Sequence, residues 1–139
     1  MEHEIKKDVE KKSGLSKGEL QKLLERWQKK LFLTEWDLKI QIVDFLRKDF
    51  RQSGNFVADL DKKTGVIQLS CNPFRDEEYI LVHEMMHVVV WSLDSYAENA
   101  ILKNHKEGDK VHGWYLEHLE RMVDKLTAIA LGREEKKYA

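Results

Sequence analysis

The chain has 139 residues, of which 42% are hydrophobic and 35% are charged, so it is long enough for one domain with a single core. Its 24 lysines and arginines nearly balance 25 aspartates and glutamates, and the formal net charge is -1. This balance argues against strong binding to nucleic acid or to an anionic membrane. The longest apolar run, residues 85–91, is interrupted by His87 and is too short to cross a membrane.

The cysteine content and the N-terminal residues indicate the cellular compartment of the protein. Cys71 is the single cysteine, so neither an intrachain disulfide nor a cysteine-rich metal site can form. The first residues lack the apolar core of a secretory signal. We therefore expect a cytoplasmic protein, since thiols stay reduced there. Residues 1–14 are mostly charged, and we expect them to form a flexible arm ahead of one domain over residues 15–139.

One helix and three strands are expected in the first half of the chain. Ser16 and Glu19 have the spacing of a capping box, and apolar residues follow at intervals of three and four, which predicts a helix over residues 16–32. Alternating apolar and polar residues indicate half-buried strands. The strands are expected at residues 36–43, 56–60 and 66–71. In the polar turn between the last two, we expect Gly65 to adopt a positive φ.

Three helices are expected in the second half. Acidic residues 76–78 suit the positive end of a helix dipole, and the apolar sequence from Tyr79 through Leu93 continues this helix. Because the helix is apolar almost all round, most of it must be buried. A short helix near residues 96–103 and an amphipathic helix at about 113–131 follow. Together with the strands, these helices predict an α+β fold.

The apolar helix contains the sequence HEMMH at residues 83–87. Two histidines four residues apart lie on one helix face, about 6 Å from each other, so both can bind one zinc ion. Glu84 points about 100° away from His83 and can act as the general base toward a metal-activated water. The alternative is a chance match between packed histidines, at a probability of roughly 3% for this composition. Polar side chains in an apolar helix are costly to bury unless something satisfies them, which favours the metal site.

The two histidines leave the zinc ion short of ligands, so a third ligand is expected downstream of the motif. Structural zinc sites usually have four protein ligands, whereas catalytic sites have three protein ligands and a water molecule. On a helical wheel of the last helix, the stripe centred on Leu119 faces the core, and Glu120 lies at its border. Glu120 is therefore the first candidate, with a solvated carboxylate paired to a neighbouring base as the structural alternative. The other candidate ligands are Glu117, His112, His118, His105 and Asp124. Side chains that could stabilise a developing oxyanion are His105, His112, Tyr96 and Tyr115.

Three segments resemble a minimal zincin domain of the kind found in phage and prophage genomes, distantly similar to the SprT-like and ImmA/IrrE groups. They are the strand at 36–40, the hairpin ending at 66–70 and the helix at 79–87, and the similarity covers most of residues 34–131. The resemblance implies a small mixed sheet of about three strands or more, packed with the active-site helix, an N-terminal helix and a C-terminal helix. It also implies an edge strand able to hold an extended peptide.

The resemblance implies a zinc metallopeptidase in which His83 and His87 bind Zn²⁺ and Glu84 is the base. The stretch from residue 120 to 126 resembles the gluzincin segment that carries a glutamate ligand, which points to Glu120. SprT-like proteins use a third histidine instead, and their His-Gly pair is similar to residues 112–113, although the gap from His87 is long.

The leading hypothesis is therefore a zinc-dependent peptidase acting on a peptide or protein substrate. One alternative is a non-catalytic zincin-fold binding or regulatory module of a phage or prophage, acting on a phage or host protein partner. Another is a DNA-associated SprT-like protease, against which the balanced charge argues.

Overall fold

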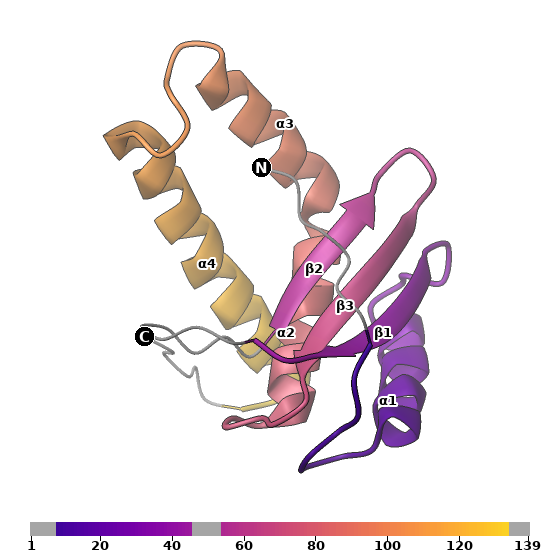
Figure 1. The fold of residues 1–139 in the computed structure, drawn as a ribbon. Coiled ribbons are helices and arrows are strands. Elements are labelled where there is room, and N and C mark those ends of the chain that lie inside the picture. Colours follow the sequence, from indigo (N-terminus) through magenta and orange to yellow (C-terminus); the bar gives the residue numbers. More distant parts are fainter. Residues whose placement is uncertain (1–7, 46–53, 134–139) are drawn as a thin grey trace. The chain divides into compact units, whose positions relative to one another are not determined.

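The computed structural model describes residues 8–45 and 54–133, and these form an α+β fold (Figure 1). The helices are α1 (Lys17–Lys30), α2 (Glu77–Val89), α3 (Trp91–Leu102) and α4 (Lys110–Leu131). The strands β1 (Asp37–Val43), β2 (Gly54–Asp59) and β3 (Thr64–Ser70) form one mixed sheet. The α+β class and the small mixed sheet predicted above are thus confirmed. The chain divides into two compact units, Met1–Met85 and Met86–Ala139, with the boundary inside α2.

Part of the expected flexible arm, residues 8–14, lies within the described structure. Val9 N–H donates to the Ile42 carbonyl at 2.9 Å, and Lys12 N–H donates to the Cys71 carbonyl at 2.8 Å. The arm segment is therefore attached to the ends of β1 and β3 through backbone groups, which composition does not reveal. Residues 1–7 lie outside the described residues. A single domain over residues 15–139 stays a prediction, because α2 is shared by the two units.

The sheet of the first unit has β3 at its centre. β1 pairs with β3 in parallel and β2 pairs with it in antiparallel orientation, so that Ile40, Ile67 and Phe56 lie side by side across the sheet. All three are buried. In β1 the apolar residues Leu38, Ile40 and Ile42 are buried in alternation with more exposed polar ones, which confirms the predicted period of two. β2 forms one edge of the sheet.

The turn between β2 and β3 differs from the prediction. Lys63, with φ 51°, adopts the left-handed conformation that we assigned to Gly65. Gly65 instead lies inside β3, where a Cβ atom would come within 2.5 Å of Phe56 Cε2. The prediction for Gly65 was therefore wrong, because the residue is needed for the close approach of an aromatic ring and not for the turn.

Helix α1 follows the sequence signals closely. Glu19 N–H donates to Ser16 Oγ at 3.1 Å and Ser16 N–H donates to Glu19 Oε1 at 3.3 Å, which confirms the capping box. The helix buries Leu20, Leu24 and Trp27. It lies beside β1 within the first unit.

The apolar helix expected from Tyr79 through Leu93 is broken at Val90. There the backbone has φ -93° and ψ 3°, and α3 begins at the next residue, so the separate helix expected near 96–103 starts earlier. Residues 88–90 are three consecutive valines, whose branched side chains lose rotamer freedom in a helix. Asp94 N–H still donates to the Val90 carbonyl, so little hydrogen bonding is lost at the break.

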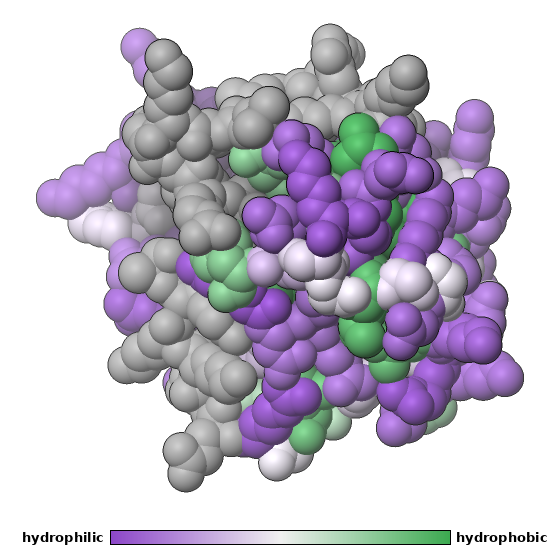
Figure 2. Space-filling view, turned by 60° about the horizontal axis from the view of Figure 1, so that its bottom comes forward, coloured by the Kyte–Doolittle hydropathy of each residue, from purple (hydrophilic) through white to green (hydrophobic). Residues whose placement is uncertain are grey.

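Hydrophilic side chains cover much of the face shown in Figure 2, and apolar ones appear there as separate patches, as the 35% charged fraction leads one to expect. Within residues 8–45 and 54–133, every helix is too short or too polar to cross a membrane.

Candidate metal centre

Helix α2 carries the His-Glu-x-x-His motif on a strip that remains accessible. From Tyr79 to Val88, every residue is buried except His83, Glu84 and His87, which are only partly buried. The sequence prediction of a mostly buried helix is confirmed. The polar side chains of the motif thus remain partly accessible to solvent.

The first turn of α2 is anchored within the first unit by two adjacent glutamates. Glu77 accepts hydrogen bonds from Leu15 N–H at 2.6 Å and from Lys11 Nζ, and both side chains of this ion pair are 10% exposed. Glu78 accepts a hydrogen bond from Trp27 Nε1 at 3.0 Å. The N-terminal arm and α1 are therefore both tied to the helix that presents the motif.

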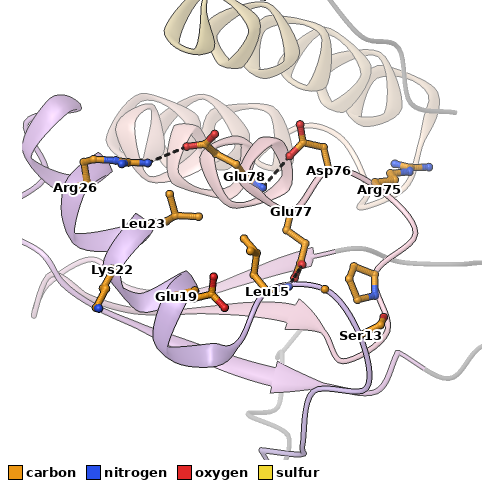
Figure 3. A pocket seen from close by; sticks show the side chains of 12 residues that line it. Ser13, Leu15, Glu19, Lys22, Leu23, Arg26, Arg75, Asp76, Glu77 and Glu78 are labelled. Atoms are coloured by element: carbon orange, nitrogen blue, oxygen red, sulfur yellow. Dashed lines mark hydrogen bonds and ion pairs between the residues drawn. The ribbon is translucent and has the colours of Figure 1, made fainter.

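A cavity of about 740 Å³ lies at these contacts, lined by the arm, α1 and the start of α2 (Figure 3). The figure shows Arg26 pointing toward Glu78, and their charged atoms are 3.4 Å apart. Neither His83 nor Glu84 lines this cavity. Because Arg26 pairs with Glu78 and Glu77 with Lys11 at these contacts, we assign the cavity to the anchoring of α2.

Two groups of the first unit lie against the motif. The Tyr79 ring, fully buried one turn before His83, has its centroid 6.4 Å from that of the imidazole. Gly54, the first residue of β2, lies so close to α2 that a Cβ atom would be 2.8 Å from Ile80 Cγ2 and 3.3 Å from Glu84 Cγ. The edge strand therefore begins beside the predicted general base.

In the second unit, His87 and Glu120 are direct neighbours. His87 Nε2 lies 3.0 Å from Glu120 Oε1, and the two side chains are 15% and 53% exposed. The buried stripe of α4 includes Leu119, Val123 and Thr127. Glu120 borders this stripe on the side of Thr127, as the helical wheel predicted.

Helix α2 runs unbroken through the boundary between the units, so His83 keeps its place one turn before His87. A ring nitrogen of each histidine and a carboxylate oxygen of Glu120 are thus available as ligand atoms. Ligands bound tetrahedrally at about 2.1 Å from zinc are about 3.4 Å apart, and two imidazoles with one carboxylate are a donor set of catalytic zinc sites. The chemistry of these donors therefore fits zinc, and the first candidate for the third ligand is the one that contacts His87.

Most of the other candidate ligands have different partners. Glu117 is paired with Arg121, one turn along α4. His105 Nδ1 lies 3.2 Å from Asp109 Oδ2 in the connection between α3 and α4. His118 is exposed and lines an apolar groove.

His112 has a structural role at the start of α4. Its Nδ1 accepts a hydrogen bond from Gly108 N–H at 2.9 Å, so Nε2 carries the proton and donates to Glu98 Oε2 at 2.8 Å. The ring is 4% exposed. The helix begins at Lys110, earlier than the start near residue 113 that we predicted, and its N-cap Asp109 accepts a hydrogen bond from His112 N–H through Oδ1.

The tyrosines proposed for oxyanion stabilisation also differ in their surroundings. Tyr115 OH donates to Asp94 Oδ1, and burial, followed by this carboxylate, raises the pKa of the phenol well above its usual range. Tyr96 is 76% exposed. Sequence spacing missed the partners Asp94 and Glu98 because both lie on α3, whereas the groups that they bind lie on α4.

Comparisons of the chain with protein-family models, with curated proteins and with solved structures found no match.

Proposed function

We propose that this protein is a zinc-dependent metallopeptidase of the zincin type that hydrolyses bonds in peptide or protein substrates in the cytoplasm. The observation that carries the proposal is the 3.0 Å approach of Glu120 to His87 beside a His-Glu-x-x-His motif on α2. Two elements far apart in the chain thus supply the donor set that the motif needs.

In this proposal each residue has a distinct task. His83 and His87 hold the ion through ring nitrogens, and Glu120 holds it through a carboxylate oxygen. When bound, zinc would supply Lewis acidity and would lower the pKa of a water molecule at the site to about 7. Glu84, on the same helix but turned away from the ligands, takes the proton from the attacking water and passes it to the leaving amine.

The position of strand β2 favours a peptide as the class of substrate. It is an edge of the sheet, so its outer backbone groups can pair with an extended chain by strand addition. Its first residue, Gly54, packs against Glu84 and Ile80. A peptide paired with β2 would therefore run past the general base.

Metal content tests the site. Wild-type protein reconstituted with zinc should hold one ion per chain, and His83→Ala and His87→Ala should each lose it while circular dichroism shows that they remain folded. Glu120→Ala should also lose the ion, whereas the matched control Glu117→Ala should keep it, because Glu117 is paired with Arg121. Folded wild type without stoichiometric zinc would overturn the proposal.

Catalysis is tested separately with Glu84→Gln. Wild type should cleave members of a quenched fluorescent peptide library, and Glu84→Gln should retain zinc while losing roughly 100-fold or more of the rate. If zinc-loaded wild type cleaved no faster than Glu84→Gln, the non-catalytic binding module would replace the peptidase.

A further inference from the structure

Gly54, the first residue of β2, does not owe its place to an unusual backbone conformation. Its φ lies outside the left-handed range that Gly14, Gly108 and Gly132 adopt. Glycine weakens a strand, because it loses more conformational entropy on folding than other residues and has no side chain to pack. A glycine at this position therefore points to the close approach of another part of the chain.

The neighbours of Gly54 across the sheet have large side chains. Gly54 pairs with Leu69 of β3, and Leu69 pairs with Ile42 of β1. Directly paired residues point to the same face of a sheet, and Leu69 and Ile42 are both buried. This row of side chains therefore ends, at the edge strand, in a position that leaves space for a side chain from another element.

Two side chains of α2 lie in the space beside Gly54. A Cβ atom at residue 54 would be 2.8 Å from Ile80 Cγ2 and 3.3 Å from Glu84 Cγ. Ile80 and Glu84 are four residues apart, so they project from the same face of the helix. Ile80 is buried in the close-packed core, whereas Glu84 is only partly buried. Of these two side chains, Glu84 is therefore the one that an added methyl group could displace.

We propose that Gly54 is a positioning residue for Glu84, and that the absence of a side chain at residue 54 fixes where the Glu84 carboxylate lies. This inference rests on the proposed role of Glu84 as the general base. Gly54 has no rotamers, so it confines the Glu84 side chain with backbone atoms that strand pairing holds in place. A proton acceptor must lie within hydrogen-bond reach of the attacking water, and a misplacement of about 1 Å can cost about 100-fold in rate.

Gly65 provides a comparison within the same sheet. A Cβ atom there would lie 2.5 Å from Phe56 Cε2, and its nearest neighbours belong to β1 and β2. The close approach at Gly65 therefore serves packing within the sheet, whereas the one at Gly54 involves the His-Glu-x-x-His motif. Gly65→Ala is thus the matched control, because it overpacks the same sheet away from Glu84.

The kinetics of the zinc-loaded protein on a fluorescent peptide that wild type cleaves test the role of Gly54 in catalysis. Gly54→Ala should keep one zinc ion per chain and lose about tenfold or more in kcat, with KM within about twofold of the wild-type value. Gly65→Ala should keep both the zinc ion and kcat, at a temperature at which circular dichroism shows it folded. A raised KM at unchanged kcat would show that the methyl group moves β2 instead of Glu84, and would overturn the inference.

A second substitution separates the two contacts of residue 54. Ile80→Leu removes the γ2 methyl group and nearly conserves volume, so it relieves the 2.8 Å contact and leaves the contact with Glu84 Cγ. In the Ile80→Leu background, Gly54→Ala should therefore cost less stability in urea than in wild type, yet it should still lower kcat about tenfold. Recovery of kcat in the double variant would assign Gly54 to packing against Ile80 alone and overturn the inference.

NMR of the full chain, with and without added zinc, tests the placement of Glu84 independently of activity. One Gly54 Hα takes the direction of the missing Cβ atom, so it should give a nuclear Overhauser effect to the Glu84 Hγ protons, which Glu84→Gln assigns. The shifts of these Hγ protons should change in Gly54→Ala and stay at their wild-type values in Gly65→Ala.

The NMR result distinguishes failure of this inference from failure of the proposed function. Absence of the Overhauser effect, or unchanged Hγ shifts in Gly54→Ala, would overturn the inference even if the protein is an active peptidase. Wild type that shows the effect and the shift change but cleaves no peptide would refute the peptidase, while the placement of Glu84 by Gly54 would stand.

Discussion

His87 Nε2 lies 3.0 Å from Glu120 Oε1, although one residue is in the last turn of α2 and the other is in the middle of α4. An imidazole nitrogen and a carboxylate oxygen this close are joined by one proton or held by one cation. The second case is the one that we propose, with His83 one turn earlier on α2 as a further ligand. The contact therefore makes Glu120 the residue whose substitution is most informative.

We expect Glu120→Gln to lower zinc affinity by more than about 100-fold, because loss of outer-shell partners alone costs 10–100-fold and Glu120 is proposed as a direct ligand. Glu120→His, which restores a ring nitrogen, should recover part of the loss. Competition with a chromophoric chelator measures both affinities. Equal affinity in wild type and Glu120→Gln would remove Glu120 from the ligand set.

Features encoded by neighbouring residues were predictable from sequence. The capping box of α1, the alternation of β1 and the spacing of His83 and His87 each depend on local geometry. Features that depend on distant partners were not. The close approach of Phe56 to Gly65 is set by strand pairing, and the anchoring of residues 8–14 is set by carbonyls at the ends of β1 and β3.

The same distinction applies to the candidate site. The wheel of α4 placed Glu120 at the border of the buried stripe, but it could not show that α2 supplies its neighbour. Likewise, the carboxylates that bind Tyr115 and His112 lie on α3, and no spacing rule along one helix connects them to α4.

The raised pKa of Tyr115 predicts a loss of stability in base. A phenol whose pKa is higher in the folded protein than in the unfolded chain contributes stability that is fully present below about pH 10. That contribution disappears as the pH rises above this value toward the folded pKa. We therefore expect the difference in thermal midpoint between wild type and Tyr115→Phe to shrink as pH increases from about 8 to 11.

Tyr96 provides the control for this experiment because it is 76% exposed. Tyr96→Phe should leave the pH dependence of the thermal midpoint as it is in wild type. A difference between wild type and Tyr115→Phe that stays constant across the range would show that the hydrogen bond to Asp94 is not linked to ionisation of the phenol.

The backbone conformation of Phe32, at the end of α1, leads us to expect that a substitution there stabilises the protein. It adopts φ 57° just after the helix, while Leu33 N–H donates to the Gln28 carbonyl at 2.8 Å. This is a Schellman motif with phenylalanine at the position that glycine favours. Because Phe32 is 88% exposed, little packing is lost, and Phe32→Gly should raise the free energy of unfolding by about 1 kcal/mol.

Phe32→Ala separates the two contributions, since it removes the exposed ring but keeps a Cβ atom in the left-handed conformation. Urea unfolding should place Phe32→Ala near wild type and below Phe32→Gly. Were both variants equally stabilised, relief of backbone strain would not be the cause.

We expect substitution of glycine by alanine to change the free energy of unfolding in opposite directions at Gly65 and at Gly113. At Gly65 the new methyl group would lie 2.5 Å from Phe56 Cε2 and 3.1 Å from Leu38 Cδ2, and both neighbours are buried. Overpacking of this kind should lower the free energy of unfolding by about 1–3 kcal/mol. At Gly113, inside α4, no described atom lies within 4 Å of the added Cβ atom apart from the chain neighbours and the backbone of the helix itself. Alanine should therefore stabilise that helix by up to about 1 kcal/mol.

A second substitution tests the cause of the loss at Gly65. Phe56→Leu shortens the side chain that the methyl group would meet, so it should destabilise Gly65→Ala less than it destabilises wild type. Urea unfolding of the two single variants and the double variant measures this coupling. Additive losses would mean that the ring does not restrict residue 65, and the destabilisation would then have to arise from the backbone of β3.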